Sequence, residues 1–162
     1  MSKQREENEM IKVKVIAVTA LLLFTAGGVF AGNFSVSAGG GGDVSYDLET
    51  DSAVYGFHGF VDITYLMVTA GINIVKKDVS FATTANLKYP INIGSSFSFF
   101  PTVGVEYRIA KKQGTFLLNA GAGMDFSIGN NAFARLTALY VFAPGDIKHG
   151  QITFRPSIGF RF

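Results

Sequence analysis

Residues 151–162 alternate almost perfectly between apolar and polar side chains. The apolar positions are Ile152, Phe154, Pro156, Ile158, Phe160 and Phe162, and the positions between them are Gln151, Thr153, Arg155, Ser157, Gly159 and Arg161. Because successive side chains of a β-strand point to opposite faces, this pattern predicts a strand with one apolar face and one polar, cationic face. A strand whose apolar face contacts lipid and whose polar face lines a lumen also explains an aromatic residue at the last position.

The same period of two recurs along the chain, in segments separated by turn residues. The predicted strands are 34–38, 57–65, 66–74, 81–91, 97–109, 115–128, 134–142 and 151–162. The segment 115–128 keeps the alternation through thirteen steps, which is long for a water-soluble sheet and suits a tilted membrane strand. Unpaired backbone groups in lipid each cost several kcal/mol, so the strands must close. The sequence therefore predicts an all-β fold, an eight-stranded antiparallel up-and-down transmembrane β-barrel.

Composition argues against other classes. The chain is 48% hydrophobic, yet no apolar run reaches the roughly 20 residues that a spanning helix needs. It has no cysteine, which excludes disulfides and thiolate metal sites. A formal net charge of +2 and the lack of basic patches with interleaved aromatic residues predict no nucleic-acid partner. We find no metal-ligand spacing and no phosphate-loop motif, so no cofactor is expected.

Residues 1–31 have the organisation of a cleavable signal peptide, which would leave residues 32–162 as an outer-membrane β-barrel domain. Two lysines and a short apolar core precede the predicted cut after Ala31. An uncleaved anchor helix is the alternative, for which the apolar core is short. Translation from either Met1 or Met10 would preserve this organisation.

Two kinds of connection are predicted between the strands. Tight turns around Tyr65, at 94–96 and at 129–131 are assigned to the periplasm. Longer, charged loops at 40–56, 75–80, 110–114 and 143–150 are assigned to the cell exterior, the usual asymmetry of such barrels. The first of these loops begins within the four-glycine run 39–42, and its acidic residues do not fit the calcium-loop spacing, so a solvated, mobile loop is expected.

Charged residues also occupy inward-facing positions of the predicted strands. They are Asp62, Lys88, Glu106, Arg108, Asp125, Arg135, Arg155 and Arg161. An eight-stranded barrel is only wide enough for side chains, and an isolated buried charge is very costly. We therefore expect these residues to form a charge network that closes the lumen. A catalytic or substrate-guiding use of the same residues is the alternative.

Lysines at the predicted outer tips indicate a cationic rim for lipopolysaccharide phosphates or other surface polyanions. These lysines are Lys76, Lys77, Lys111, Lys112 and Lys148. The alternative is that these lysines are solvated residues at hairpin tips and have no binding function. Outward aromatic residues near the strand ends predict girdles that meet the lipid head groups, with a protein interface as the alternative.

His58 is the residue on which an enzyme would depend. Asp62 lies four residues further along the same predicted face, about 13 Å away by strand rise, which is too far for a hydrogen bond. Ser52 would have to fold back from the adjacent loop to complete a nucleophilic site. We therefore expect no enzymatic activity.

The chain resembles the small eight-stranded outer-membrane barrel proteins of double-membraned bacteria, the group that includes the OmpA transmembrane domain and the OmpX and OmpW types. The resemblance covers residues 32–162 and rests on the signal peptide, Leu87-Lys88-Tyr89-Pro90, the segment 99–107 and the segment 158–162. The last segment is similar to the signal read by the barrel-assembly machinery, with Phe162 as the final aromatic residue and Phe160 two positions before it. Ser157 stands where a glycine is usual in that signal.

The resemblance implies an exported, integral protein of the bacterial outer membrane that contacts outer-membrane lipids and the barrel-assembly machinery. It implies a non-enzymatic, structural or surface-interaction role. The loops look too short for the protruding sheet of an OmpX-type adhesin. A small OmpW-like transport barrel for small or apolar solutes is the alternative, and a lipid A-modifying barrel enzyme is a second one.

Overall fold

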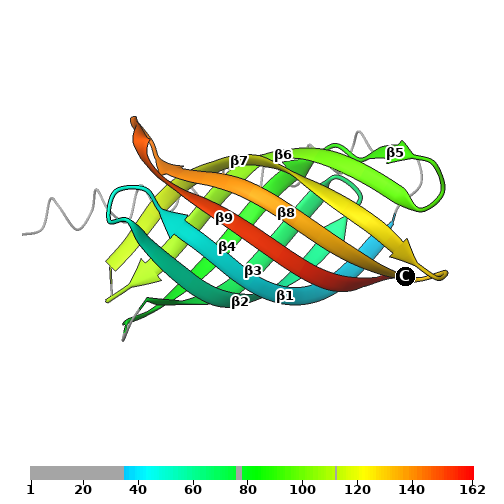
Figure 1. Cartoon of the computed structure of the whole chain (residues 1–162), viewed down its shortest axis with the longest axis horizontal. Coiled ribbons are helices and arrows are strands. Elements are labelled where there is room, and N and C mark those ends of the chain that lie inside the picture. Colours follow the sequence, from blue (N-terminus) through cyan, green and yellow to red (C-terminus); the bar gives the residue numbers. More distant parts are fainter. Residues whose placement is uncertain (1–34, 76–77, 112) are drawn as a thin grey trace, which may run out of the picture. The chain divides into compact units, whose positions relative to one another are not determined.

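The computed structural model describes residues 35–75, 78–111 and 113–162, so the predicted signal peptide lies outside the described residues. The described chain forms one antiparallel β-sheet (Figure 1). Its strands are β1 (Val36–Asp47), β2 (Ser52–Ile63), β3 (Leu66–Val75), β4 (Asp78–Lys88), β5 (Ile91–Ile93), β6 (Phe97–Ala110), β7 (Gln113–Ile128), β8 (Ala132–Ala143) and β9 (Asp146–Arg161). None of these described residues belongs to a helix long and apolar enough to cross a membrane.

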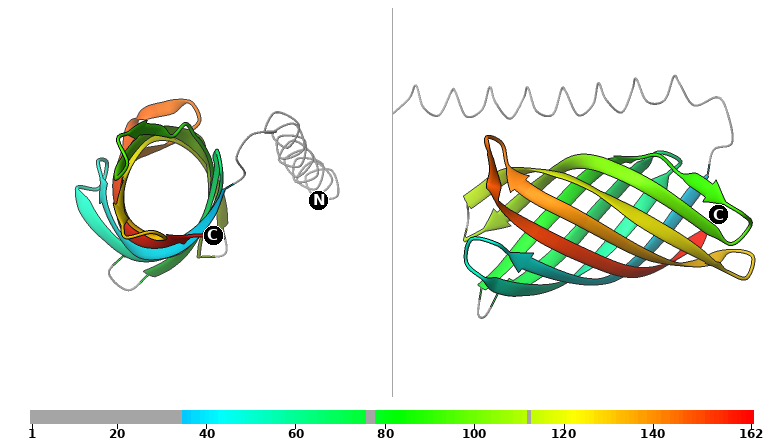
Figure 2. Two further views of the ribbon diagram at one scale, coloured as in Figure 1. Left: turned by 90° about the vertical axis from the view of Figure 1, so that its right-hand side faces the viewer. Right: turned by 45° about the horizontal axis from the view of Figure 1, so that its top comes forward.

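The sheet closes into an eight-stranded barrel, in which β4 and β5 together occupy one strand position beside β6. The strand order is β4-β3-β2-β1-β9-β8-β7-β6-β5, and β4 also pairs with β6. Strand β5 continues the path of β4 beside β6 after an interruption at Tyr89 and Pro90, where the backbone N–H of Tyr89 donates to the Pro101 carbonyl over 3.1 Å. Proline has no N–H to offer the ladder, which explains the break. The predicted eight-stranded antiparallel barrel is therefore confirmed, and Figure 2 shows it end-on.

Side chains alternate between the lumen and the outer surface, as the sequence pattern predicts. In β2, for example, His58 and Phe60 are buried, whereas Tyr55 and Phe57 are 61% and 70% exposed on the outside. Exposed aliphatic and aromatic residues continue around the other strands. A surface so uniformly apolar is unfavourable in water and is what acyl chains solvate.

The predicted loop at residues 40–56 is wrong. Strand β1 includes the glycine run and continues to Asp47, so that the connection to β2 is only residues 48–51. Glycine usually weakens a strand, which is why the run reads as a loop. Here a Cβ on Gly39 or Gly41 would overlap backbone carbonyl oxygens of β9, so only glycine permits this close approach of the two strands.

The other predicted outer loops, at 75–80, 110–114 and 143–150, are also wrong. Each gap between the strands there is two residues long, from β3 to β4, from β6 to β7 and from β8 to β9. Strands that extend past the lipid are solvated on both faces, so their polar residues lose the alternation that marks a strand. We call the end of the barrel with these gaps the distal end, and the end that holds Ser35 and Phe162 the terminal end.

The terminal end carries the longest described connection. Residues 89–96, which include β5, join β4 to β6 there, so the turn predicted at 94–96 is the tip of a small hairpin. Residues 64–65 and 129–131 make the tight turns that the sequence predicts. The expected contrast between short turns at one end and long loops at the other is therefore not found.

Candidate functional site

The eight predicted inward-facing charges occupy lumen-facing positions, and seven of them meet in two groups. The Arg135 cluster consists of Asp62, Lys88, Asp125 and Arg135. The Arg155 network contains Glu106, Arg108 and Arg155 together with Asp43, His58, Ser157 and Gln151. The eighth charge, Arg161, lies apart from both groups, near the terminal end.

Arg135 on β8 is paired with carboxylates on two other strands, and one of these carboxylates also binds a lysine from a third strand. Its Nε and Nη2 donate to the two carboxylate oxygens of Asp125 on β7, over 2.6 and 2.8 Å. Nη2 also lies 2.7 Å from Oδ2 of Asp62 on β2, and Nζ of Lys88 on β4 lies 2.5 Å from that same oxygen. A bidentate guanidinium–carboxylate pair of this kind is among the strongest ionic contacts in proteins.

Three aromatic rings surround the Arg135 guanidinium. The rings of Phe60, Phe133 and Phe100 have their centroids 4.6, 4.9 and 5.0 Å from its Cζ. Phe100 and Phe133 are 1% and 0% exposed, so the lumen is densely filled at this level. Cation–π attraction is larger when the cation is desolvated, and it offsets part of the cost of burying the charge.

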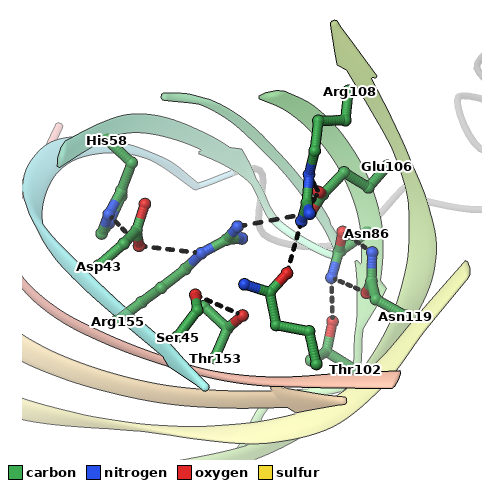
Figure 3. A network of polar contacts seen from close by, with 11 residues as sticks. Asp43, Ser45, His58, Asn86, Thr102, Glu106, Arg108, Asn119, Thr153 and Arg155 are labelled. Carbon is green, nitrogen blue, oxygen red and sulfur yellow. Dashed lines mark hydrogen bonds and ion pairs between the residues drawn. The ribbon is translucent and has the colours of Figure 1, made fainter. Parts of the chain in front are cut away.

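The Arg155 network crosses the lumen from β9 to β6 (Figure 3). Nε of Arg155 donates to Oδ1 of Asp43 over 3.1 Å, and its Nη2 lies 3.6 Å from Oε2 of Glu106. Arg108 donates through Nη2 to Oε1 of Glu106 over 2.6 Å and to Oε1 of Gln151 over 2.8 Å. The acid–base pairs therefore connect opposite walls of the barrel.

The environment of His58 differs from the sequence-based expectation. Asp62 and Ser52 are not its partners; instead Nε2 lies 2.9 Å from Oγ of Ser157, and Nδ1 lies 2.9 Å from Oδ1 of Asp43. Sequence reasoning missed Asp43 because it lay in the mispredicted loop. Both contacts depend on register, since Gly41 is paired with His58 on one side and Ser157 on the other.

A carboxylate, an imidazole and a serine in this order are the elements of a hydrolytic triad. Each of the three residues is at most 8% exposed. The Nδ1 contact is short, but it lies off the direction of a good hydrogen bond, and the same oxygen of Asp43 is shared with Arg155. The arrangement therefore contains the residue types of a triad, but its serine is buried and a substrate has no free access to it.

Uncharged polar side chains fill the rest of the lumen. Asn86 donates through Nδ2 to Oδ1 of Asn119 over 2.8 Å and to Oγ1 of Thr102 over 3.3 Å, and the hydroxyls of Ser45 and Thr153 meet at 2.9 Å (Figure 3). Within the described ranges, no group of three His, Asp or Glu side chains is arranged to hold a metal ion.

Of the predicted cationic rim, only Lys111 can be placed with its side chain. Its Nζ lies 2.8 Å from Oδ2 of Asp78 at the distal end, and both side chains are well exposed. The hydrogen bond to Asp78, and next their Coulomb attraction, raises the pKa of Lys111 above its usual value. Lys76, Lys77 and Lys112 lie outside the described residues, as does the side chain of Lys148.

Aromatic residues gather at both ends of the outer surface. At the terminal end Tyr65 stacks on Tyr89 and Phe97 packs against Phe126; at the distal end Tyr107 packs against Phe116 and Tyr140 stacks on Phe142. Phe160 and Phe162, the predicted assembly signal, face outward and are 54% and 83% exposed. Aromatic residues concentrated towards both ends of an apolar outer surface are typical of membrane barrels.

Comparison with known proteins decides the fold class. No protein-family model and no curated protein matches the chain. Among solved structures it is similar to the N-terminal β-barrel domain of Pseudomonas aeruginosa OprF, with 14% identity, a TM-score of 0.53, and coverage of 79% of this chain and 97% of that one. The chain has the fold of a small eight-stranded outer-membrane barrel.

Two further neighbours have the same fold. Neisserial surface protein A is 12% identical with a TM-score of 0.52, over 79% of this chain and 95% of that chain. Ail, the attachment invasion locus protein of Yersinia pestis, solved in complex with the heparin analogue sucrose octasulfate, is 14% identical with a TM-score of 0.54, over 81% of this chain and 100% of that chain. At these identities the likeness concerns the fold alone.

Proposed function

We propose that this chain is a non-enzymatic, integral protein of the bacterial outer membrane, with a structural or surface-interaction role and a lumen closed by charge pairs. The contacts that cross the barrel carry this proposal. Arg155 reaches from β9 to Glu106 on β6, and Arg135 reaches from β8 to Asp62 on β2. Side chains tied to opposite walls leave little room for a continuous water path.

The outer-membrane location is supported by the fold and by the apolar outer surface with aromatic residues concentrated towards both ends. We expect the protein to remain in the outer-membrane fraction after density-gradient separation of cell envelopes. We also expect its folded and boiled forms to migrate differently in mild detergent electrophoresis, because a closed barrel resists unfolding until it is heated. Recovery in the soluble fraction as a folded monomer would contradict the proposal.

The closed lumen distinguishes this proposal from the alternative, an OmpW-like transport barrel. We expect the protein reconstituted in planar bilayers to give no steady single-channel steps, since ions would have to displace the Arg155 network and the Arg135 cluster. A porin incorporated in the same bilayer is the positive control. Steady steps that scale with the amount of this protein would favour transport.

The proposal of a non-enzymatic role rests on the surroundings of His58. Catalysis by Ser157 would need an open site and donors for a developing oxyanion. Strand amides are committed to the ladders on both sides, and Ser157 does not line the cavity at the terminal end of the barrel. A lipid A-modifying activity would require substrate to enter the packed lumen, so a packing role suits His58 better.

Surface interaction is the more specific part of the proposal. The Ail neighbour was solved with a heparin analogue, which is a polyanion. By the same chemistry, the lysines of the predicted cationic rim (Lys76, Lys77, Lys111, Lys112 and Lys148) would contact lipopolysaccharide phosphates or other surface polyanions. The outward rings of Phe160 and Phe162 would be read by the barrel-assembly machinery.

A further inference from the structure

The terminal end of the barrel contains a cavity of about 370 Å³, which we call the terminal cup. The Arg135 cluster and Arg161 contribute its charged lining. Its walls are rich in hydroxyl and amide groups, from Ser37, Thr64, Asn92, Ser95, Ser98 and Ser127. The volume lies within the range of small-molecule sites, and the lining suits a polar ligand.

The charges that line the cup do not balance. Its cations are Lys88, Arg135 and Arg161, and its carboxylates are Asp62 and Asp125. Lys88 and Arg135 are in ion pairs with those carboxylates. In the part of the chain that the structure describes, no carboxylate lies within 4.0 Å of the Arg161 guanidinium. One positive charge in the cup is therefore left without a counter-charge.

Arg161 is held in a defined position although it lacks an acidic partner. Its Nη1 donates to Oγ of Ser127 over 2.9 Å, and its Cζ lies 4.8 Å from the centroid of the Phe133 ring. This one hydrogen bond leaves other N–H groups of the guanidinium fork for a ligand. Such a fork is suited to bind two oxygens of a carboxylate or phosphate.

Asp62 adds a second unfilled position to the same cup. Its Oδ2 accepts from Lys88 and Ser37, whereas Oδ1 is buried and accepts no hydrogen bond from the described residues. The residue is only 2% exposed, and an unsatisfied buried acceptor is unfavourable. A hydroxyl donor would satisfy it, so the cup offers a site for an anionic group and a site for a hydroxyl group.

We propose that the terminal cup binds a small oxyanion that also carries hydroxyl groups, such as a sugar phosphate or a sugar acid. The anionic group binds the Arg161 fork, and the hydroxyl groups bind Asp62 and the serine-rich wall. A site for such a ligand is compatible with a closed lumen, because the Arg135 cluster forms the inner boundary of the cup.

Isothermal titration of the full-length protein in detergent micelles tests the proposal with four probes. Glucose 6-phosphate and glucuronate carry both required groups, glucose lacks the anion, and inorganic phosphate lacks the sugar hydroxyls. We expect at least one of the first two to bind at least tenfold more tightly than glucose and phosphate, and the tighter of the two identifies the anionic group. No binding of either, or equal binding of glucose, would overturn the proposal.

Two variants with the same change in charge make the test specific. Arg161→Gln is expected to weaken binding of the tighter probe by about tenfold or more, which is the effect of losing one charge-assisted contact. Arg108→Gln removes a cation of the Arg155 network that does not line the cup and is expected to leave the affinity unchanged. If Arg161→Gln fails to fold, Ser127→Ala, which releases the guanidinium, should weaken binding instead. If the folded variant, either Arg161→Gln or Ser127→Ala, binds the probe as tightly as the original protein, the proposed site is wrong.

Discussion

Replacement of Arg135 by methionine is expected to destabilise the barrel by about 3–5 kcal/mol, the usual effect of removing one partner from a buried ionic cluster. Methionine preserves the apolar stem but leaves the Asp125 carboxylate buried without the partner that binds both of its oxygens. The same change removes a cation from the centre of three aromatic rings. Urea unfolding in detergent micelles, followed by circular dichroism, measures the loss.

Two further variants separate the charge effect from a packing effect. The double variant Arg135→Met with Asp125→Asn should recover part of the stability, because the unpaired carboxylate is removed. Lys111→Met breaks an ion pair that is exposed at the distal end and should change stability little. An Arg135→Met barrel as stable as the original would show that the cluster contributes no net stability.

The substitution Gly41→Ala is expected to open the seam between β1 and β9 and to cost about 1–3 kcal/mol or more, as overpacking does. The added methyl group would overlap the Pro156 carbonyl oxygen and come within 2.7 Å of Cα of Ser157, and neither backbone atom can move alone. It would also disturb the contact between His58 and Ser157, because these two residues are the cross-strand partners of Gly41 on either side. The shift in the urea midpoint measures the effect.

The neighbouring glycine provides a matched control. A Cβ at Gly42 would meet only the Gly56 carbonyl oxygen, at 3.8 Å. Gly42→Ala should therefore be neutral or stabilise the barrel slightly, because alanine restricts the unfolded chain. Equal destabilisation by both substitutions would show that the close approach at Gly41 does not determine the result.

The strands were predictable where lipid and lumen impose opposite requirements on alternate residues. The segments that became β2, β3 and β6–β9 alternate clearly, and both the barrel class and its lumen-facing positions follow from them. The pattern is lost where a strand leaves the lipid or where close packing demands glycine. Both situations occur in β1, where the four-glycine run and the acidic residues after it conceal a strand.

The site was less predictable, because it depends on register. The alternation along each strand places His58, Asp62 and Arg135 in the lumen. It does not show which residues of other strands lie at the same height along the barrel axis. His58 meets Asp43 and Ser157 because both β2 and β9 pair with β1. That Arg161 has no acidic partner among the described residues likewise becomes clear only after the partners of the other described lumen cations are known.

The sequence assigns the distal end to the cell exterior, where its short connections would restrict what can recognise this protein. The connection from β1 to β2 is residues 48–51, and the β8–β9 gap is two residues. In that orientation only the strand ends and these short connections would lie above the head groups, and an antibody, phage fibre or host receptor would have to bind close to the lipid surface. Long polysaccharide chains on neighbouring lipids would screen the barrel from such molecules, so its visibility on a cell depends on the length of that surrounding glycan layer.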